Sequence, residues 1–183
     1  MIPFPDKKYN IIYADPPWHY NNYAYKDAIR GVEKEYDTMS QVDLCNLGVS
    51  SIAADDSVLL LWSTLPLLKE ALDTIDAWGF IYKTTAFVWI KTNKNSMGLF
   101  WGMGNWTRSN AELCLLGIKG KPQRLNADVH QVIMSPIGKH SRKPDEVVRG
   151  RILQLCGDLP RIELFARRRV DGWDAWGNEV END

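Results

Sequence analysis

The sequence contains few cysteines and no long run of apolar residues. Its three cysteines, Cys45, Cys114 and Cys156, lie far apart and form no pair with the spacing of metal ligands. An odd number of widely spaced cysteines is typical of thiols in a reducing compartment. No apolar stretch approaches the roughly 20 residues that span a membrane, and residues 1–5 lack the basic segment of a secretory signal. We therefore expect a cytoplasmic protein with no metal site and no membrane anchor.

Net charge is also nearly absent, since the formal charge is −1 over 183 residues. A protein of this composition that binds the phosphate backbone of nucleic acid needs a local basic face. An apolar fraction of 45% and a charged fraction of 25% are ordinary for a folded domain, and the length predicts one domain over residues 1–183. The sequence has no GxGxxG motif, which argues against a dinucleotide-dependent oxidoreductase.

The most informative stretch is a strand that ends in an acid, two prolines and a tryptophan. The apolar run 9–14 predicts a strand buried on both faces, and Asp15, Pro16, Pro17 and Trp18 follow it directly. Because proline cannot donate to a sheet ladder, the strand ends there, at the edge where open α/β sheets bind ligands. Such a hook suits an amino group on a planar base: Asp15 accepts one N–H, the Pro16 carbonyl accepts the other, and Trp18 stacks on the base. We expect no neighbouring N–H to occupy the Pro16 carbonyl. The alternative is an ordinary strand end followed by a turn.

Strands and helices alternate along the rest of the chain. Strands are predicted from β-branched and aromatic content, and helices from caps and apolar spacing. Asp55 and Asp56 are expected to turn the chain. The predicted strands cover residues 57–62, 80–83, 84–91, 111–118, 129–134 and 161–166, with a strand or turn at 173–176, and the predicted helices cover about 40–53, 66–78 and 144–156. This alternation predicts an α/β fold with a mostly parallel, twisted sheet flanked by helices.

Two long loops are candidates for target binding. Residues 19–39 follow the hook directly and form a candidate lid over a bound base, with Tyr20 and Asn21 as contacts, although their tyrosines could equally pack the segment down. Residues 92–110 interleave glycines with Trp101 and Trp106, and Arg108 follows these tryptophans within the same loop. Such a loop can stack splayed nucleotides and contact their backbone. The alternative is that its indoles pack back onto the domain. We expect residues 180–183 to be frayed.

The hook and eight further motifs, in order, resemble the MT-A-seventy (DPPW-type) family of N6-adenine methyltransferases. The resemblance covers about residues 9 to 180. It implies a Rossmann-like class I methyltransferase fold, with the catalytic motif placed before the cofactor motif, and S-adenosylmethionine as the methyl donor. Besides Asp15–Trp18, the matching motifs are Trp62–Thr64, Ala77–Phe80, Val88–Asn93, Glu112–Gly117, Ser141–Glu146, Ile162–Arg167, Gly172–Trp173 and Trp176–Glu179.

The same resemblance implies a set of cofactor contacts. Lys143 pairs with the methionine carboxylate of the donor, and residues 162–167 form the cofactor-binding strand. Larger family members also carry an acidic cofactor contact well upstream of the hook. Here only 14 residues precede Asp15, and Asp6 is a poor substitute. The remaining implied contacts are Glu163, Phe165, Arg167, Arg169, Asn178 and Glu179.

Methylation of adenine N6 in DNA is the first functional hypothesis, because the short chain lacks the RNA-binding extensions of larger relatives. RNA is the alternative nucleic acid. A catalytically silent scaffold subunit is a second class of function, although such family members usually carry a broken hook. Methylation of cytosine N4 is disfavoured because that family pattern usually begins with serine and ends in tyrosine. The sequence does not predict the recognition site, the strand preference or the oligomeric state.

Overall fold

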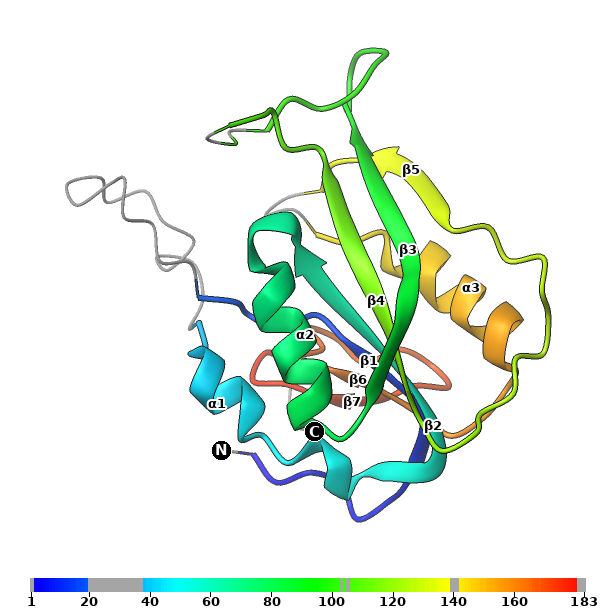
Figure 1. The fold of residues 1–183 in the computed structure, drawn as a ribbon. Helices are drawn as coiled ribbons and strands as arrows, with labels where there is room; N and C mark the ends of the chain where they lie inside the picture. The colour runs from blue at the N-terminus through cyan, green and yellow to red at the C-terminus, as the bar shows by residue number, and fades with distance from the viewer. Residues whose placement is uncertain (1, 20–37, 103, 105, 139–141, 181–183) are drawn as a thin grey trace.

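The computed structural model describes residues 2–19, 38–102, 104, 106–138 and 142–180. Seven strands form one sheet, and short helices flank it (Figure 1). The strands are β1 (Tyr9–Ala14), β2 (Ala53–Thr64), β3 (Ile81–Thr92), β4 (Ala111–Lys119), β5 (Val132–Pro136), β6 (Arg161–Leu164) and β7 (Asp174–Trp176). The α-helices are α1 (Gln41–Cys45), α2 (Leu68–Ala77) and α3 (Asp145–Cys156), and the 3₁₀ turns are η2 (Val49–Ser51) and η3 (Leu65–Leu67).

The sheet is mostly parallel, as predicted. Its strand order is β5-β3-β4-β2-β1-β6-β7. Strand β4 runs antiparallel to both of its neighbours, β2 and β3, and the four other neighbouring pairs are parallel. Strand β1 therefore lies between β2 and β6, and the carboxyl ends of these three strands meet at one edge, where parallel sheets present ligand sites.

Both faces of the sheet are buried, because successive side chains of a strand point to opposite faces. Ile12 of β1 joins a cluster that contains Leu44 of α1 and Ile75 of α2. The neighbouring Tyr13 joins a second cluster that contains Val148 of α3. Helices α1 and α2 thus cover one face and α3 covers the other (Figure 1). This layering confirms the predicted α/β fold with helices on both sides.

Two predicted boundaries are wrong. The helix expected over residues 40–53 ends at Cys45, with Asn46 as its C-cap, and Gly48 in a left-handed conformation (φ 70°) then begins the separate turn η2. Its predicted start is correct, since the Ser40 hydroxyl accepts the Asp43 N–H at 3.1 Å. Asp55 and Asp56 lie inside β2 instead of forming a turn, exposed beside a shift in register between β1 and β2.

The remaining differences are small. Residues 80–83 and 84–91 were expected as separate strands, but residues 81–92 form the single strand β3. Val180 is 8% exposed and its N–H bonds to the Gly177 carbonyl, so the expected fraying does not begin at this residue.

Within the described part of the chain, no helix is both long enough and apolar enough to cross a membrane.

Candidate active site

The predicted hook lies directly after β1, at the edge where β1, β2 and β6 end. Ala14, the last residue of β1, is in register with Leu61 of β2 and Leu164 of β6. Asp15 follows and keeps 37% of its side chain exposed, while Pro16 is buried. The structure therefore places a partly open carboxylate on a rigid support at the sheet edge.

The two prolines are fixed through their carbonyl groups. The Trp18 N–H donates to the Pro16 carbonyl at 2.9 Å, and the Met39 N–H donates to the Pro17 carbonyl at 2.9 Å. The sequence suggested that no neighbouring N–H would occupy the Pro16 carbonyl. This is wrong, because the backbone folds tightly enough after Pro17 for Trp18 to reach back. A carbonyl oxygen has two lone pairs, so Pro16 can still accept a second hydrogen bond.

Trp18 serves as an anchor of the hook rather than as an open stacking surface. Its side chain is 7% exposed and lies in the apolar cluster of the α1 and α2 face. Its indole N–H donates to the Trp62 carbonyl at 3.0 Å. The predicted stacking of Trp18 on a base does not agree with this burial. The ring instead holds the hook against β2.

A buried pair of charged residues stands behind Asp15. The Lys143 Nζ lies 3.0 Å from Asp15 Oδ1 and 2.8 Å from Glu112 Oε2. Lys143 comes just before α3, and Glu112 lies near the start of β4. Their side chains are 10% and 5% exposed. Glu112 belongs to one of the family motifs, but no role was predicted for it, because its distance from Asp15 and Lys143 along the chain conceals the contact.

These neighbours control the protonation of the site. Burial raises the pKa of Asp15, and the Lys143 ammonium opposes this rise. Burial by itself would lower the pKa of Lys143, but the Asp15 and Glu112 carboxylates outweigh it and raise that pKa. The pKa of Glu112 is lowered, because Lys143 and Lys91 outweigh the effect of its burial. Lys143 is therefore a firmly charged cation at neutral pH.

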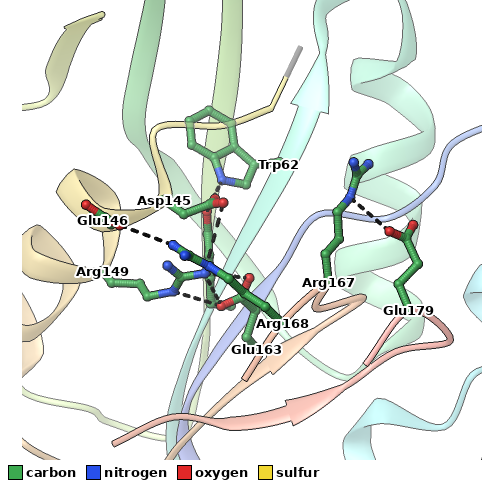
Figure 2. A network of polar contacts seen from close by, with 9 residues as sticks. Trp62, Asp145, Glu146, Arg149, Glu163, Arg167, Arg168 and Glu179 are labelled. Atoms are coloured by element: carbon green, nitrogen blue, oxygen red, sulfur yellow. Dashed lines mark hydrogen bonds and ion pairs between the residues drawn. The ribbon is translucent and has the colours of Figure 1, made fainter. Parts of the chain in front are cut away.

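The predicted cofactor strand is joined to α3 by a bidentate ion pair. Arg149 donates to the two oxygens of Glu163 at 2.8 and 3.0 Å (Figure 2). Arg149 also lies 4.0 Å from Asp145, which accepts a hydrogen bond from the Tyr13 hydroxyl at 3.1 Å. The Tyr13 oxygen in turn accepts the Trp62 indole N–H at 2.7 Å. Glu163, predicted as a cofactor contact, is thus engaged with α3.

The other predicted cofactor residues fall into two groups. Asn178 and Glu179 are exposed just after β7, and Arg167 lies 3.8 Å from Glu179 (Figure 2). Phe165 follows β6 with a left-handed backbone (φ 60°) and contacts Trp176 edge-on, with ring centroids 5.5 Å apart. These residues gather at the carboxyl ends of β6 and β7, near the hook edge.

Arg169 lies elsewhere. It lines a surface cavity of about 610 Å³ together with Asp6, Lys7 and Asp174. Asp174 begins β7 and Asp6 precedes β1, so the cavity is at the edge opposite to the hook. This position does not favour a cofactor contact for Arg169. Asp6 is likewise separated from Asp15 by the whole of β1, a span of roughly 20 Å, which does not favour it as an acidic cofactor contact.

The predicted target-binding loop is open to solvent. Trp101 is 74% exposed, Trp106 is 100% exposed, and Arg108 is also exposed. The alternative, in which these indoles pack back onto the domain, is wrong in this structure. The Gly102 N–H bonds to the Ser109 carbonyl at 3.1 Å and closes the loop. Tyr20 and Asn21 lie outside the described residues, as does most of the expected lid.

The site combines an acid, a buried cation and a solvent-exposed aromatic loop at the carboxyl edge of an α/β sheet. Among the described residues there is no group of three or more candidate metal ligands. This arrangement is typical of α/β enzymes, which bind ligands beyond the carboxyl ends of their strands.

The chain belongs to the MT-A70 family, whose profile matches residues 9–179. It is 37% identical over 193 residues to the Type II methyltransferase M.MunI of Mycoplasma sp, covering 96% of this chain and 79% of that protein. It is 32% identical to the Drosophila melanogaster N(6)-adenosine-methyltransferase MT-A70-like protein and 29% identical to the human N(6)-adenosine-methyltransferase catalytic subunit METTL3. The chain covers 27% and 28% of the lengths of these two relatives. The predicted family and the methyltransferase class are confirmed.

Proposed function

We propose that this protein is an S-adenosylmethionine-dependent methyltransferase that modifies the exocyclic N6 of adenine in DNA. The observation that carries the proposal is the intact hook, with Asp15 partly exposed at the carboxyl end of β1 and paired with Lys143 at 3.0 Å. An adenine amino group has two N–H donors, and the hook offers two acceptors, the Asp15 carboxylate and the second lone pair of the Pro16 carbonyl.

The residues around the hook suit a cofactor that is an amino acid at one end and a nucleoside at the other. Lys143 is a buried cation that can hold a carboxylate, and Asn178 and Glu179 are exposed polar groups that can bind ribose hydroxyls. All three lie with the hook at the carboxyl edge of the sheet. S-adenosylmethionine, when bound, supplies an electrophilic methyl group.

The chain contributes orientation and charge to the reaction. The adenine amino nitrogen is a poor nucleophile, because its lone pair is delocalised into the ring. Hydrogen bonds from both N–H groups to Asp15 and Pro16 favour a pyramidal nitrogen whose lone pair points away from the hook. Asp15 need not remove a proton beforehand. As an anion it stabilises the positive charge that develops on the nitrogen, and it or water then accepts the proton.

Because Trp18 is buried, the loop that carries Trp101 and Trp106 supplies the aromatic side chains that stack on the target base. Their exposed indoles suit bases that are splayed out of a strand, and Arg108 suits a phosphate. In a duplex the target base must leave its stack at a cost of a few kcal/mol, which such contacts partly offset.

DNA is placed first because the chain matches 79% of the length of a Type II methyltransferase, at 37% identity. RNA is the second candidate, because other relatives of the chain are named N(6)-adenosine-methyltransferases. This chain matches only 27% and 28% of the lengths of these relatives. Their similarity therefore supports the methyl-transfer reaction more than the choice of nucleic acid.

The test is incubation of the enzyme with isotopically labelled S-adenosylmethionine and matched pools of DNA and RNA, followed by nucleoside mass spectrometry. We expect N6-methyl-2′-deoxyadenosine from DNA and its loss in Asp15→Asn. Label in N6-methyladenosine alone would transfer the proposal to RNA. Full activity of Asp15→Asn would remove the hook from the chemistry.

A further inference from the structure

Four charged side chains of alternating sign form a continuous buried chain that ends at Asp15. Lys91 of β3 forms an ion pair with Glu112 Oε1. Glu112 uses its other oxygen, Oε2, to contact Lys143, and Lys143 contacts Asp15. The exposed fractions of the Lys91, Glu112, Lys143 and Asp15 side chains are 11%, 5%, 10% and 37%. Only the Asp15 end opens to solvent.

The sheet supplies an apolar floor for this chain. Lys91 lies over the Trp89 ring, with its Nζ 5.0 Å from the centroid, and Lys143 lies over the Trp62 ring at 5.5 Å. Both indoles are fully buried. Charges above such a surface are poorly screened by water and interact strongly with one another. A change in charge at one end of this series of ion pairs therefore alters the electrostatic potential at the other end.

Lys91 has no place in the proposed chemistry, because Glu112 and Lys143 separate it from Asp15. Burying a lysine is costly unless its charge is compensated, so its position needs an explanation. Glu112 divides its carboxylate between two lysines, and Lys143 divides its ammonium between two carboxylates. If Lys91 were neutral, Glu112 would have only Lys143 as a partner and would draw it away from Asp15.

We propose that Lys91 is a positioning residue for methyl transfer: by occupying Glu112, it leaves Lys143 available to hold Asp15 in its ionised form and in the orientation that grips the amino group. This inference rests on the proposed function of Asp15. Through it, a side chain on β3 controls a carboxylate that directly follows β1, although the strands β4 and β2 lie between β3 and β1.

Several other ionisable groups interact electrostatically with Asp15. Asp145 at the start of α3 raises its pKa, as Glu112 does. Glu163 of β6, Cys114 of β4 and Tyr13 of β1 also interact with its charge. These groups are unchanged when Lys91 is replaced, so a shift in the titration of Asp15 would report the Lys91–Glu112–Lys143 chain.

The test follows the ionisation of Asp15 directly, by carbon-13 NMR of its carboxyl group in cofactor-free protein, with the signal assigned from Asp15→Asn. In Lys91→Met we expect the pKa of Asp15 to rise by about one unit, which is a tenfold change in its ionised fraction. Lys91→Arg, which keeps the charge, should restore the wild-type titration. Lys69→Met removes an exposed ion pair on α2 and should change nothing.

A double variant should shift the pKa of Asp15 in the opposite direction. In Lys91→Met/Glu112→Gln the Lys143 ammonium serves Asp15 alone, so the pKa of Asp15 should fall below the wild-type value. The double variant also leaves no buried charge unpaired, so it tests the proposal even if Lys91→Met fails to fold. A titration of Asp15 that is the same in all variants would overturn the inference.

The acid limb of the pH–rate profile of methyl transfer should move in the same directions. Activity requires ionised Asp15, so it is present above the pKa and lost below it. The limb should therefore move to higher pH in Lys91→Met and to lower pH in the double variant. If the acid limb is unchanged in both variants while Asp15→Asn abolishes activity, Lys91 is not a positioning residue, and the proposed function is unaffected. Full activity of Asp15→Asn would reject both.

Discussion

Replacing Arg149 with methionine should destabilise the protein more than any surface charge change. Arg149 is 5% exposed and makes two hydrogen bonds to Glu163, whose side chain is 13% exposed. Methionine keeps the length of the side chain but leaves the Glu163 carboxylate buried without its cation. Removing one partner of a buried pair costs about 3–5 kcal/mol. With a slope of roughly 2 kcal/mol per M, the urea midpoint should fall by about 2 M.

The control is Arg168→Met. Arg168 also forms an ion pair near α3, with Glu146 (Figure 2). The two atoms are 3.1 Å apart, but the side chains are 51% and 84% exposed. A pair in this environment contributes about 0.5 kcal/mol or less. Arg149→Met/Glu163→Gln should recover a large part of the loss, because the unpaired charge is gone. Equal midpoints for Arg149→Met and Arg168→Met would refute the reasoning.

The loss should also depend on pH. Burial raises the pKa of Glu163 above its ordinary value, and Arg149 opposes this rise. Without Arg149 the folded-state pKa rises further above the unfolded value. A carboxyl whose pKa is raised by folding favours the native state below the unfolded pKa, and this contribution is lost as pH rises through the folded pKa. The stability deficit of Arg149→Met should therefore be smaller at pH 5 than at pH 8, and a deficit that is constant over this range would contradict the assignment.

Three further results are expected. Lys143→Ala should weaken binding of S-adenosylmethionine, and an unchanged dissociation constant by calorimetry would reject its role as the carboxylate contact. Trp101→Ala combined with Trp106→Ala should lower nucleic-acid affinity by about 1–3 kcal/mol for each stacked base, measured by fluorescence anisotropy, with cofactor affinity preserved; equal losses of both affinities would indicate misfolding. Gly102→Ala should give a similar loss of nucleic-acid affinity, because a Cβ there would lie 2.1 Å from the Ser109 carbonyl oxygen and force the loop open; wild-type affinity would show that this closure is not required.

The sequence predicted what depends on local chemistry. The buried strand before Asp15 and its end at Pro16 follow from the residue types alone, and so does the start of α1 at Ser40. The predicted helix over residues 40–53 was too long, because Gly48 has a left-handed backbone that separates α1 from η2, and helical spacing alone does not reveal that conformation.

The polar partners of the site were less predictable. Glu112 and Lys143 are 31 residues apart in the sequence, and their contact exists only because β4 runs antiparallel beside β2. Arg149 appeared to be one more charged residue on a helix, yet it is the partner of Glu163. The burial of Trp18 likewise changed its predicted role, because a tryptophan can either stack on a base or anchor the backbone in the core. Such pairs depend on the order of strands in the sheet, which no local pattern encodes.

The contacts at Met39 have a consequence for the evolution and engineering of this enzyme. The chain leaves the hook at Trp18 and returns in a parallel bridge to Met39, and the His19 ring lies 3.2 Å from the Thr38 hydroxyl. The two ends of the intervening segment are thus tied together at a narrow neck. Doubling the length of a segment tied in this way costs only about 0.6 kcal/mol in closure entropy. Insertions between these two ends should therefore cost little closure entropy, while the hook below the neck keeps its geometry.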